Sequence, residues 1–274
     1  PASALVDRVE WKWLYHSETG QGYYGYDLLN DQPVGPTKFW LAGDTRTAVF
    51  FLIATGAAPP ELWDRMERRK IETADLTFYA PGYEWGGLFM QAMDGIFLDE
   101  RTTEAGRSVA DLAWHQIGFA QARGLPAWGW SNCNIPNAGY TEGGFLPWWV
   151  VTPHASALVI EYYPGHVIRN LRNLEAMGMR QPVSGTGPSY GFRDSLNLYT
   201  KICDNRYLAL DQAMLFLSLA NYTRDGLVRS HFAKDPLVEA GIQRLGKRLA
   251  PDVAWLREWR RRDALPGGAA LKPC

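Results

Sequence analysis

The segment 208–222, LALDQAMLFLSLANY, constrains the fold of this chain more than any other. It is apolar around almost its whole circumference, whereas a surface helix carries an apolar stripe on one side only. It is also too short for a bilayer, which takes about 20 apolar residues. The segment therefore predicts a helix buried in a large core. Asp211 within it needs a partner if it is buried, and we expect Arg46 or Arg193 in that role.

Most of the remaining chain also predicts helices, joined by aromatic-rich loops. Apolar spacing, capping residues and terminating glycines or prolines place them near 45–55, 59–66, 87–98, 104–123, 167–177 and 236–249, with another starting at Thr152-Pro153. Only 23–28 and 76–79 have the pattern of strands. Helix after helix, one of them apolar on all sides, favours two concentric helical layers. We expect an all-α fold, an α/α toroid, in one domain over 1–274 with a mobile tail from about 260.

Charge and patterning exclude several classes of function. The 274 residues carry a formal net charge of -1, which argues against a nucleic-acid groove or an anionic membrane surface as the main partner. No membrane-spanning run or leader peptide is recognisable, and the start at Pro1 suggests that a leader or an upstream region has been removed.

Cofactor chemistry also finds little support. The chain contains no GxGxxG, no phosphate loop and no Gly-x-Ser-x-Gly elbow. Its five histidines show no metal spacing, and Cys133, Cys203 and Cys274 form neither a zinc motif nor a disulfide framework. We therefore expect no cofactor and no metal.

The aromatic content is high, with 12 Trp, 13 Tyr and 11 Phe. A large core is one explanation. Sugar stacking is the other, because aromatic rings offer flat apolar faces with polar rims. The candidate sugar platforms are Trp85, Trp128, Trp130, Trp148, Trp149 and Tyr190.

Several short segments resemble, in order, motifs of the glycoamylase-like domain family. They are YGYDLL at 24–29, DTRTA at 44–48, ATGAAPPELW at 54–63, EWGGLFM at 84–90, GLPAWGWS at 124–131, VVTPHASAL at 150–158 and YGFRDSL at 190–196. That family includes the carboxy-terminal catalytic domain of cyclic β-1,2-glucan synthases and related β-1,2-glucanases. The resemblance covers roughly residues 20 to 250 and implies an (α/α)6 barrel that acts on carbohydrate, in the periplasm or outside the cell, with the cytoplasm as the alternative. Twelve helices need more chain than this, so amino-terminal helices would be missing or shortened.

The resemblance also has a gap at the family's catalytic acid. The acid of the synthase-like members falls at Asn132, and the nearby Asp of glucanase relatives falls at Asn134. An acidic pair that often precedes the Pro153 helix falls at Pro147 and Trp148. The acid has therefore moved, or the chain departs from the standard chemistry.

Glycosidic cleavage uses two carboxyl groups, one as acid and one as base or nucleophile. The resemblance implies Asp194 as base or nucleophile, with a helix cap as the alternative explanation. Glu142, in a flexible loop beside aromatic residues, is the first candidate for the acid, and an exposed loop carboxylate is the alternative. Glu84 competes with it, although a first-turn glutamate stabilised by the helix dipole explains it equally well. The candidate substrate-binding residues, besides the aromatics, are Asp44, Arg46, Asn132, His154, Arg193 and Asp211.

Three functions remain open. The first is a glycoside hydrolase or transglycosylase that acts on a β-glucan, with an oligosaccharide or polysaccharide as its only expected partner. The second is a sugar-binding protein that lost the acid, favoured by Asn132 and Asn134. The third is a polysaccharide lyase, in which Tyr190 or His154 would be the base and Arg193 the charge neutraliser. Reaction products distinguish the three functions. New reducing ends indicate a hydrolase, unsaturated ends indicate a lyase, and binding without any product indicates a sugar-binding protein.

Overall fold

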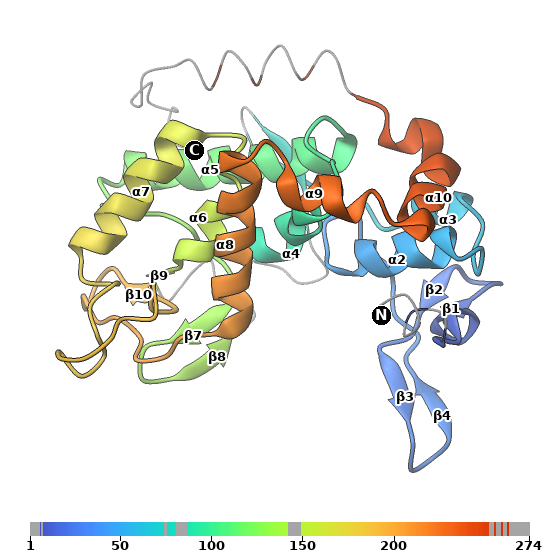
Figure 1. Ribbon diagram of the computed structural model, residues 1–274, viewed down its shortest axis with the longest axis horizontal. Coiled ribbons are helices and arrows are strands. Elements are labelled where there is room, and N and C mark those ends of the chain that lie inside the picture. Colours follow the sequence, from blue (N-terminus) through green and yellow to red (C-terminus); the bar gives the residue numbers. More distant parts are fainter. Residues whose placement is uncertain are drawn as a thin grey trace.

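The structure is a computed structural model that describes residues 6, 8–73, 76–80, 87–141, 149–251, 255, 259 and 262. Helices dominate it, and short strand pairs lie at its edges (Figure 1). Four candidate residues, Glu84, Trp85, Glu142 and Trp148, lie outside the described residues, as does most of the expected tail.

The amino-terminal third contains short hairpins followed by two helices. Its elements are η1 (Trp11–Leu14), β1 (Tyr15–His16), β2 (Gln21–Gly22), β3 (Gly25–Asp27), β4 (Gln32–Val34), α2 (Thr45–Ala54), α3 (Glu61–Arg65), β5 (Lys70–Glu72) and β6 (Thr77–Tyr79). The β3–β4 hairpin projects away from the helices in Figure 1. The strands expected at 23–28 and 76–79 are confirmed.

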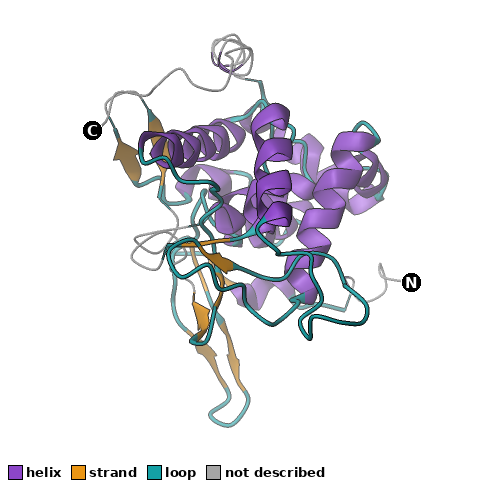
Figure 2. Ribbon diagram, turned by 90° about the vertical axis from the view of Figure 1, so that its left-hand side faces the viewer, coloured by secondary structure: helices purple, strands orange, loops and turns teal. Residues whose placement is uncertain are grey.

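The remainder is mainly helical. It comprises α4 (Leu88–Ala92), η2 (Met93–Ile96), α5 (Glu104–Ala122), β7 (Cys133–Ile135), β8 (Gly139–Thr141), β9 (Val150–Val151), α6 (Pro153–Ala157), α7 (Pro164–Ala176), β10 (Leu196–Asn197), α8 (Ala209–Thr223), α9 (Leu227–Phe232), α10 (Pro236–Leu245) and η3 (Gly246–Leu249). Figure 2 shows the helices gathered together, with strands and loops along one side.

Capping explains where several helices begin. The side chains of Thr103, Thr152 and Asp235 accept hydrogen bonds from the backbone N–H groups of Gly106, Ala155 and Leu237. The start expected at Thr152-Pro153 and the start of the helix expected near 236 are thus confirmed. Asp44 does precede α2, but its side chain is exposed and makes no capping hydrogen bond.

Buried apolar side chains form two main clusters. The larger one contains residues of α4, α5, α6 and α7, including Leu88, Ile117 and Val167. The second joins α2 to α10, where Gly241 allows close approach to the ring of Phe50. The two clusters correspond to the left and right of Figure 1.

The expectation for 208–222 is wrong in one respect. The segment forms α8, yet only one of its faces is buried, and Asp211, Met214, Ser218 and Asn221 form that face. On the other side Leu210 and Phe216 are 52% and 68% exposed. Residues at spacings of three and four lie on one face of a helix, so an all-round apolar composition could not show which face would be covered. The covered face is the polar one.

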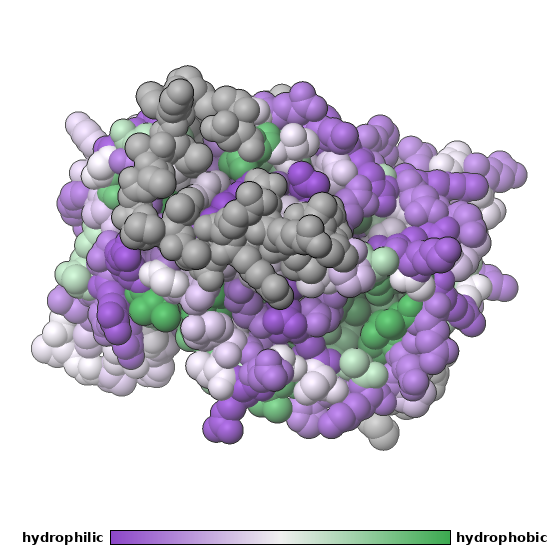
Figure 3. Space-filling view, turned by 90° about the horizontal axis from the view of Figure 1, so that it is seen from above, coloured by the Kyte–Doolittle hydropathy of each residue, from purple (hydrophilic) through white to green (hydrophobic). Residues whose placement is uncertain are grey.

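The helical fold class is confirmed only in its coarse form. In the described residues the strands occur as antiparallel pairs two or three residues long, and the helices do not close a ring of twelve. Among those residues no helix is long and apolar enough to cross a membrane. The face seen from above in Figure 3 is largely hydrophilic, with separate small apolar areas.

Candidate functional site

Asp194 is held by loops and strands that come from distant parts of the chain. Its backbone N–H donates to the carbonyl of Arg206 at 3.0 Å, and its Oδ2 accepts from the backbone N–H of Asn134 at 2.5 Å. Directly after it, β10 pairs with β9, which leads into α6. The Asp194 side chain is consequently buried, at 1% exposure.

Two helix starts bring His154 and Asp211 to the same place. His154 lies in the first turn of α6, Asp211 lies in the first turn of α8, and these helices pack together. His154 Nδ1 is 3.3 Å from Asp211 Oδ2. One ligand atom from each of His154, Asp194 and Asp211 lies within 4.8 Å of the other two. We call these three residues the acid–imidazole cluster.

Burial sets the protonation of the acid–imidazole cluster. Burial, the hydrogen bond to Asp194 and the charge of Asp194 raise the pKa of Asp211 to about 9. Burial also raises the pKa of Asp194, but the hydrogen bonds from Asp211 and from the Asn134 N–H oppose this. Burial lowers the pKa of His154 to about 3. At neutral pH these shifts favour a protonated Asp211 and a neutral His154, so the His154–Asp211 contact is no ion pair.

Three polar atoms of the cluster are poorly satisfied. Apart from the proton shared by the carboxyls, His154 Nδ1, Asp194 Oδ1 and Asp211 Oδ2 have no hydrogen-bond partner in the described residues. Buried polar atoms normally have one. Chemically, such atoms can bind a sugar hydroxyl or a cation.

The arginines expected to partner Asp211 lie elsewhere. Arg193 donates from Nη2 to the carbonyl of Gly178 at 2.9 Å. Arg46 is 1% exposed and pairs with Glu100 at 2.7 Å and with Asp94 at 3.2 Å. The sequence indicated that Asp211 needs a partner if it is buried. It could not identify the neighbouring residue, because that depends on how α6 and α8 pack.

The asparagines at the expected acid positions are buried beside the cluster. Asn132 is 3% exposed and Asn134 is 5% exposed. The backbone of Asn134, rather than its side chain, binds Asp194, and its carbonyl accepts a hydrogen bond from the Ser195 hydroxyl. Asn134 thus supports Asp194 through its backbone without supplying a carboxyl group.

The candidate sugar platforms divide into core and surface residues. Trp128 and Trp130 are core residues, 6% and 0% exposed, and amides of Asn170 and Gln116 bind their backbones. Trp149 is half-buried. Tyr190 is 69% exposed and packs edge-on against Tyr207, with ring centroids 5.6 Å apart. Tyr190, four residues before Asp194, is therefore the candidate among these four with an open face.

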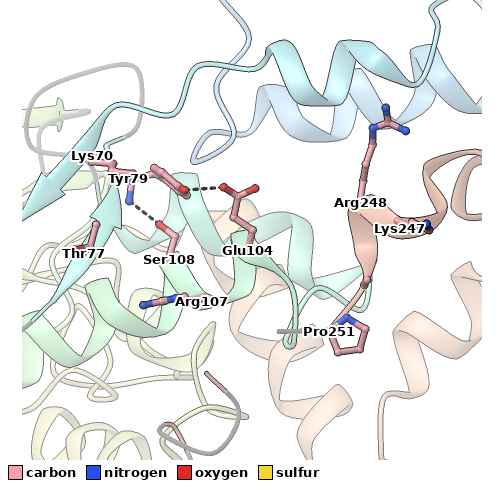
Figure 4. A pocket seen from close by; sticks show the side chains of 10 residues that line it. Lys70, Thr77, Tyr79, Glu104, Arg107, Ser108, Lys247, Arg248 and Pro251 are labelled. Carbon is pink, nitrogen blue, oxygen red and sulfur yellow. Dashed lines mark hydrogen bonds between the residues drawn. The ribbon is translucent and has the colours of Figure 1, made fainter. Parts of the chain in front are cut away.

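A separate cavity of about 550 Å³ lies between β5–β6, the start of α5 and residues 247–251 (Figure 4). Lys70, Arg107, Lys247 and Arg248 line it, and Tyr79 donates a hydrogen bond to Glu104 at 2.6 Å within it. Arg248 is already bound to Asp64 at 2.6 Å. Sequence analysis did not identify this cavity because its walls come from segments far apart in the chain.

Comparison with known proteins places the chain in a family. Residues 47–236, more than half of the chain, match the model of the Glycoamylase family, which is described as "Putative glucoamylase". The chain belongs to the Glycoamylase family. This membership confirms the resemblance carried by the motifs from 24–29 to 190–196.

Curated and solved relatives of this Glycoamylase-family chain are glucan-related proteins. It is 25% identical over 303 aligned residues to the cyclic β-(1,2)-glucan synthase NdvB of Rhizobium meliloti, an alignment that covers 99% of this chain and 10% of that protein. Its fold is similar to that of an endo-β-1,2-glucanase from Chitinophaga pinensis, with a TM-score of 0.70 and 19% identity over 89% of this chain and 63% of the other. A β-1,2-glucanase from Parabacteroides distasonis gives a TM-score of 0.70 and 18% identity, over 89% of this chain and 40% of the other. The chain thus spans about a tenth of the curated relative and less than two thirds of these structures.

Proposed function

We propose that this chain cleaves or transfers glucosyl units of a β-glucan, with a β-1,2-linked glucan as the first candidate substrate. Membership of the Glycoamylase family supports action on a glycoside, and the glucan synthase and glucanases among its relatives support the β-1,2 linkage. The observation that carries the proposal is Asp194, a buried carboxyl group at the position implied by the YGFRDSL motif, with an oxygen that accepts no hydrogen bond in the described residues.

Asp194 and Asp211 act together as one catalytic group. The two carboxyls that attack a glycosidic bond lie about 5–5.5 Å apart in retaining enzymes and about 6.5–9.5 Å apart in inverting ones. Asp194 and Asp211 share a hydrogen bond, so no sugar fits between them. Asp194 is then the base or nucleophile, and protonated Asp211 is a positioning residue that donates to it.

The general acid must come from a different carboxyl. Glu142 is our first candidate, because it directly follows β8 in the sequence, and β8 pairs with the strand whose Asn134 binds Asp194. Glu84 is the second, because it lies shortly before α4, whose first residues are bound to Trp130 and Ser131. The proposed mechanism therefore uses two carboxyl groups, with Asp194 on one side of the glycosidic bond and Glu142 or Glu84 on the other.

The test is product formation from β-1,2-, β-1,3- and α-glucans. Asp194→Asn and Glu142→Gln should each lower kcat/KM for the accepted glucan by roughly a hundredfold or more. Asp225→Asn and Glu239→Gln make the same chemical changes at exposed positions and should leave activity unchanged. If activity survives Glu142→Gln but is lost in Glu84→Gln, the general acid is Glu84 rather than Glu142. Full activity in Asp194→Asn would reject the proposal.

A sugar-binding protein without catalysis is the second candidate. Asn132 and Asn134 favour it, because both positions where the resemblance implies an acid carry a buried amide. Binding of a glucan without any product, in wild type and in Asp194→Asn alike, would establish this function and exclude the hydrolase.

A further inference from the structure

The acid–imidazole cluster combines donor atoms that are typical of a metal site. Imidazole nitrogen and carboxylate oxygen are both ligands of Zn²⁺, usually at about 2.0–2.2 Å. Two ligands at that distance from one ion lie about 3–4 Å apart, and His154 Nδ1 is 3.3 Å from Asp211 Oδ2. All three ligand atoms lie within 4.8 Å of one another.

Unsatisfied buried atoms are the second, independent observation. His154 is 1% exposed, Asp194 is 1% exposed and Asp211 is 5% exposed. Nδ1 of the first and one oxygen of each carboxyl have no hydrogen-bond partner in the part of the chain that the structure describes. An unpaired buried polar atom destabilises the folded state, so a ligand that satisfied all three atoms would be favoured.

Charge favours a cation over a neutral ligand. Within the residues that the structure describes, no arginine or lysine forms an ion pair with Asp194 or Asp211, and Arg206, whose charge acts on Asp194, is paired with Asp204 at 2.7 Å. The two buried carboxyls therefore lack a cationic side chain among the described residues, and a bound cation would supply the missing positive charge.

We propose that His154, Asp194 and Asp211 bind one divalent transition-metal cation, with Zn²⁺ as the probe. One imidazole and two carboxylates suit zinc or manganese better than calcium or magnesium, which prefer oxygen ligands alone. The cation binds the three unpartnered atoms, His154 Nδ1, Asp194 Oδ1 and Asp211 Oδ2. It therefore competes with the role that the proposed function gives to Asp194, and zinc inhibits glucan cleavage.

Calorimetric titration of the chelator-treated full chain with ZnCl₂ tests the site. Wild type should bind one ion, and His154→Gln and Asp211→Asn should each weaken binding by about tenfold or more, since each removes a ligand. His231→Gln removes an exposed histidine and should leave the affinity unchanged. No binding, or equal affinity in wild type and both cluster variants, overturns the proposal.

Zinc absorption-edge spectroscopy on the wild type keeps the test decisive if a variant does not fold. One imidazole and additional oxygen ligands, without sulfur, are expected; a sulfur ligand or the absence of imidazole overturns the proposal. Both binding measurements are independent of activity. If the chain binds zinc but cleaves no glucan, the cation site stands and the proposed function is rejected. If it cleaves a glucan but binds no zinc, the proposed function stands and the cation site is rejected.

Discussion

At the scale of single residues, we expect the buried ion pairs of Arg46 to be especially sensitive to substitution. Arg46, Asp94 and Glu100 are all at most 2% exposed, and Arg46 also donates to the carbonyls of Leu41 and Gln91. One guanidinium thus ties α2 to η2 and to the start of the segment before α5. Desolvation makes such a group of charges costly, but removal of one member costs more because the others stay buried.

Arg46→Met should therefore lower the free energy of unfolding by about 3–5 kcal/mol, because Glu100 and Asp94 lose their counter-charge. Urea denaturation measures this. Arg224→Met at an exposed position should change stability by less than about 0.5 kcal/mol. Equal effects of the two substitutions would contradict a structural role for the Arg46 pairs.

Asp94 should give stability a distinctive pH dependence. Burial raises its pKa to about 7 in the folded chain, and Arg46 opposes this only in part. Because the folded state binds this proton more tightly than the unfolded state, the contribution is complete below about pH 4 and is lost as pH rises toward 7. We expect the difference in free energy of unfolding between wild type and Asp94→Asn to become smaller, as a contribution favouring wild type, between about pH 4 and pH 7. Urea denaturation at each pH measures this difference. A difference that rises with pH would show that the Arg46 pair outweighs desolvation.

At the scale of elements, the contact between α2 and α10 depends on Gly241. A Cβ at this position would lie 2.7 Å from the Phe50 ring and 2.8 Å from the Ala54 Cβ. These distances are too short for real contacts, so the helices would have to separate.

Gly241→Ala should consequently destabilise the chain by about 1–3 kcal/mol, measured as a shift in Tm or denaturation midpoint. Gly165→Ala in α7 is the matched control, since a Cβ there meets nothing within 4 Å. The control should be neutral or stabilising by up to about 1 kcal/mol, because alanine favours helix. If neither substitution destabilised the chain, α10 would have to lie farther from α2 than it does in the structure.

The two faces of α8 should respond differently to substitution. Met214 is 2% exposed, and Met214→Ala should cost about 2–5 kcal/mol. Phe216 is 68% exposed, and Phe216→Ser should cost less than about 1 kcal/mol by denaturation. A large cost for Phe216→Ser would mean that its face is covered in solution.

At the scale of the whole molecule, buried polar side chains connect segments that are distant in the chain. Arg229 of α9 bonds to Glu161 at 2.6 Å and to the carbonyl of Gly95 at 3.1 Å, and Asn221 of α8 donates to the carbonyl of Ile96 at 2.9 Å. The residues that these contacts join lie 68 to 134 positions apart in the chain.

We expect the chain to unfold as one unit, in line with the predicted single domain. Tryptophan fluorescence and far-ultraviolet circular dichroism should then give coincident urea transitions. Two separate transitions would show that the cluster of α2 and α10 unfolds independently of the larger core.

Local sequence determined much of this protein. Caps at Thr152 and Asp235, apolar spacing along α5 and α7, and terminal glycines such as Gly178 act within a few residues, so the helices could be predicted from the chain. The motif around Asp194 also identified the family, because its residues are contiguous.

Only the tertiary structure decided which residues meet. Asp211 lies beside His154, 57 positions earlier in the chain, rather than beside Arg46 or Arg193, because the packing of α6 against α8 sets that distance. The same packing buried the polar face of α8 and left Phe216 exposed. It also placed Trp128 and Trp130 in the core. Periodicity shows which side chains share a face, but the neighbouring elements determine which face is covered and which charges lose their water.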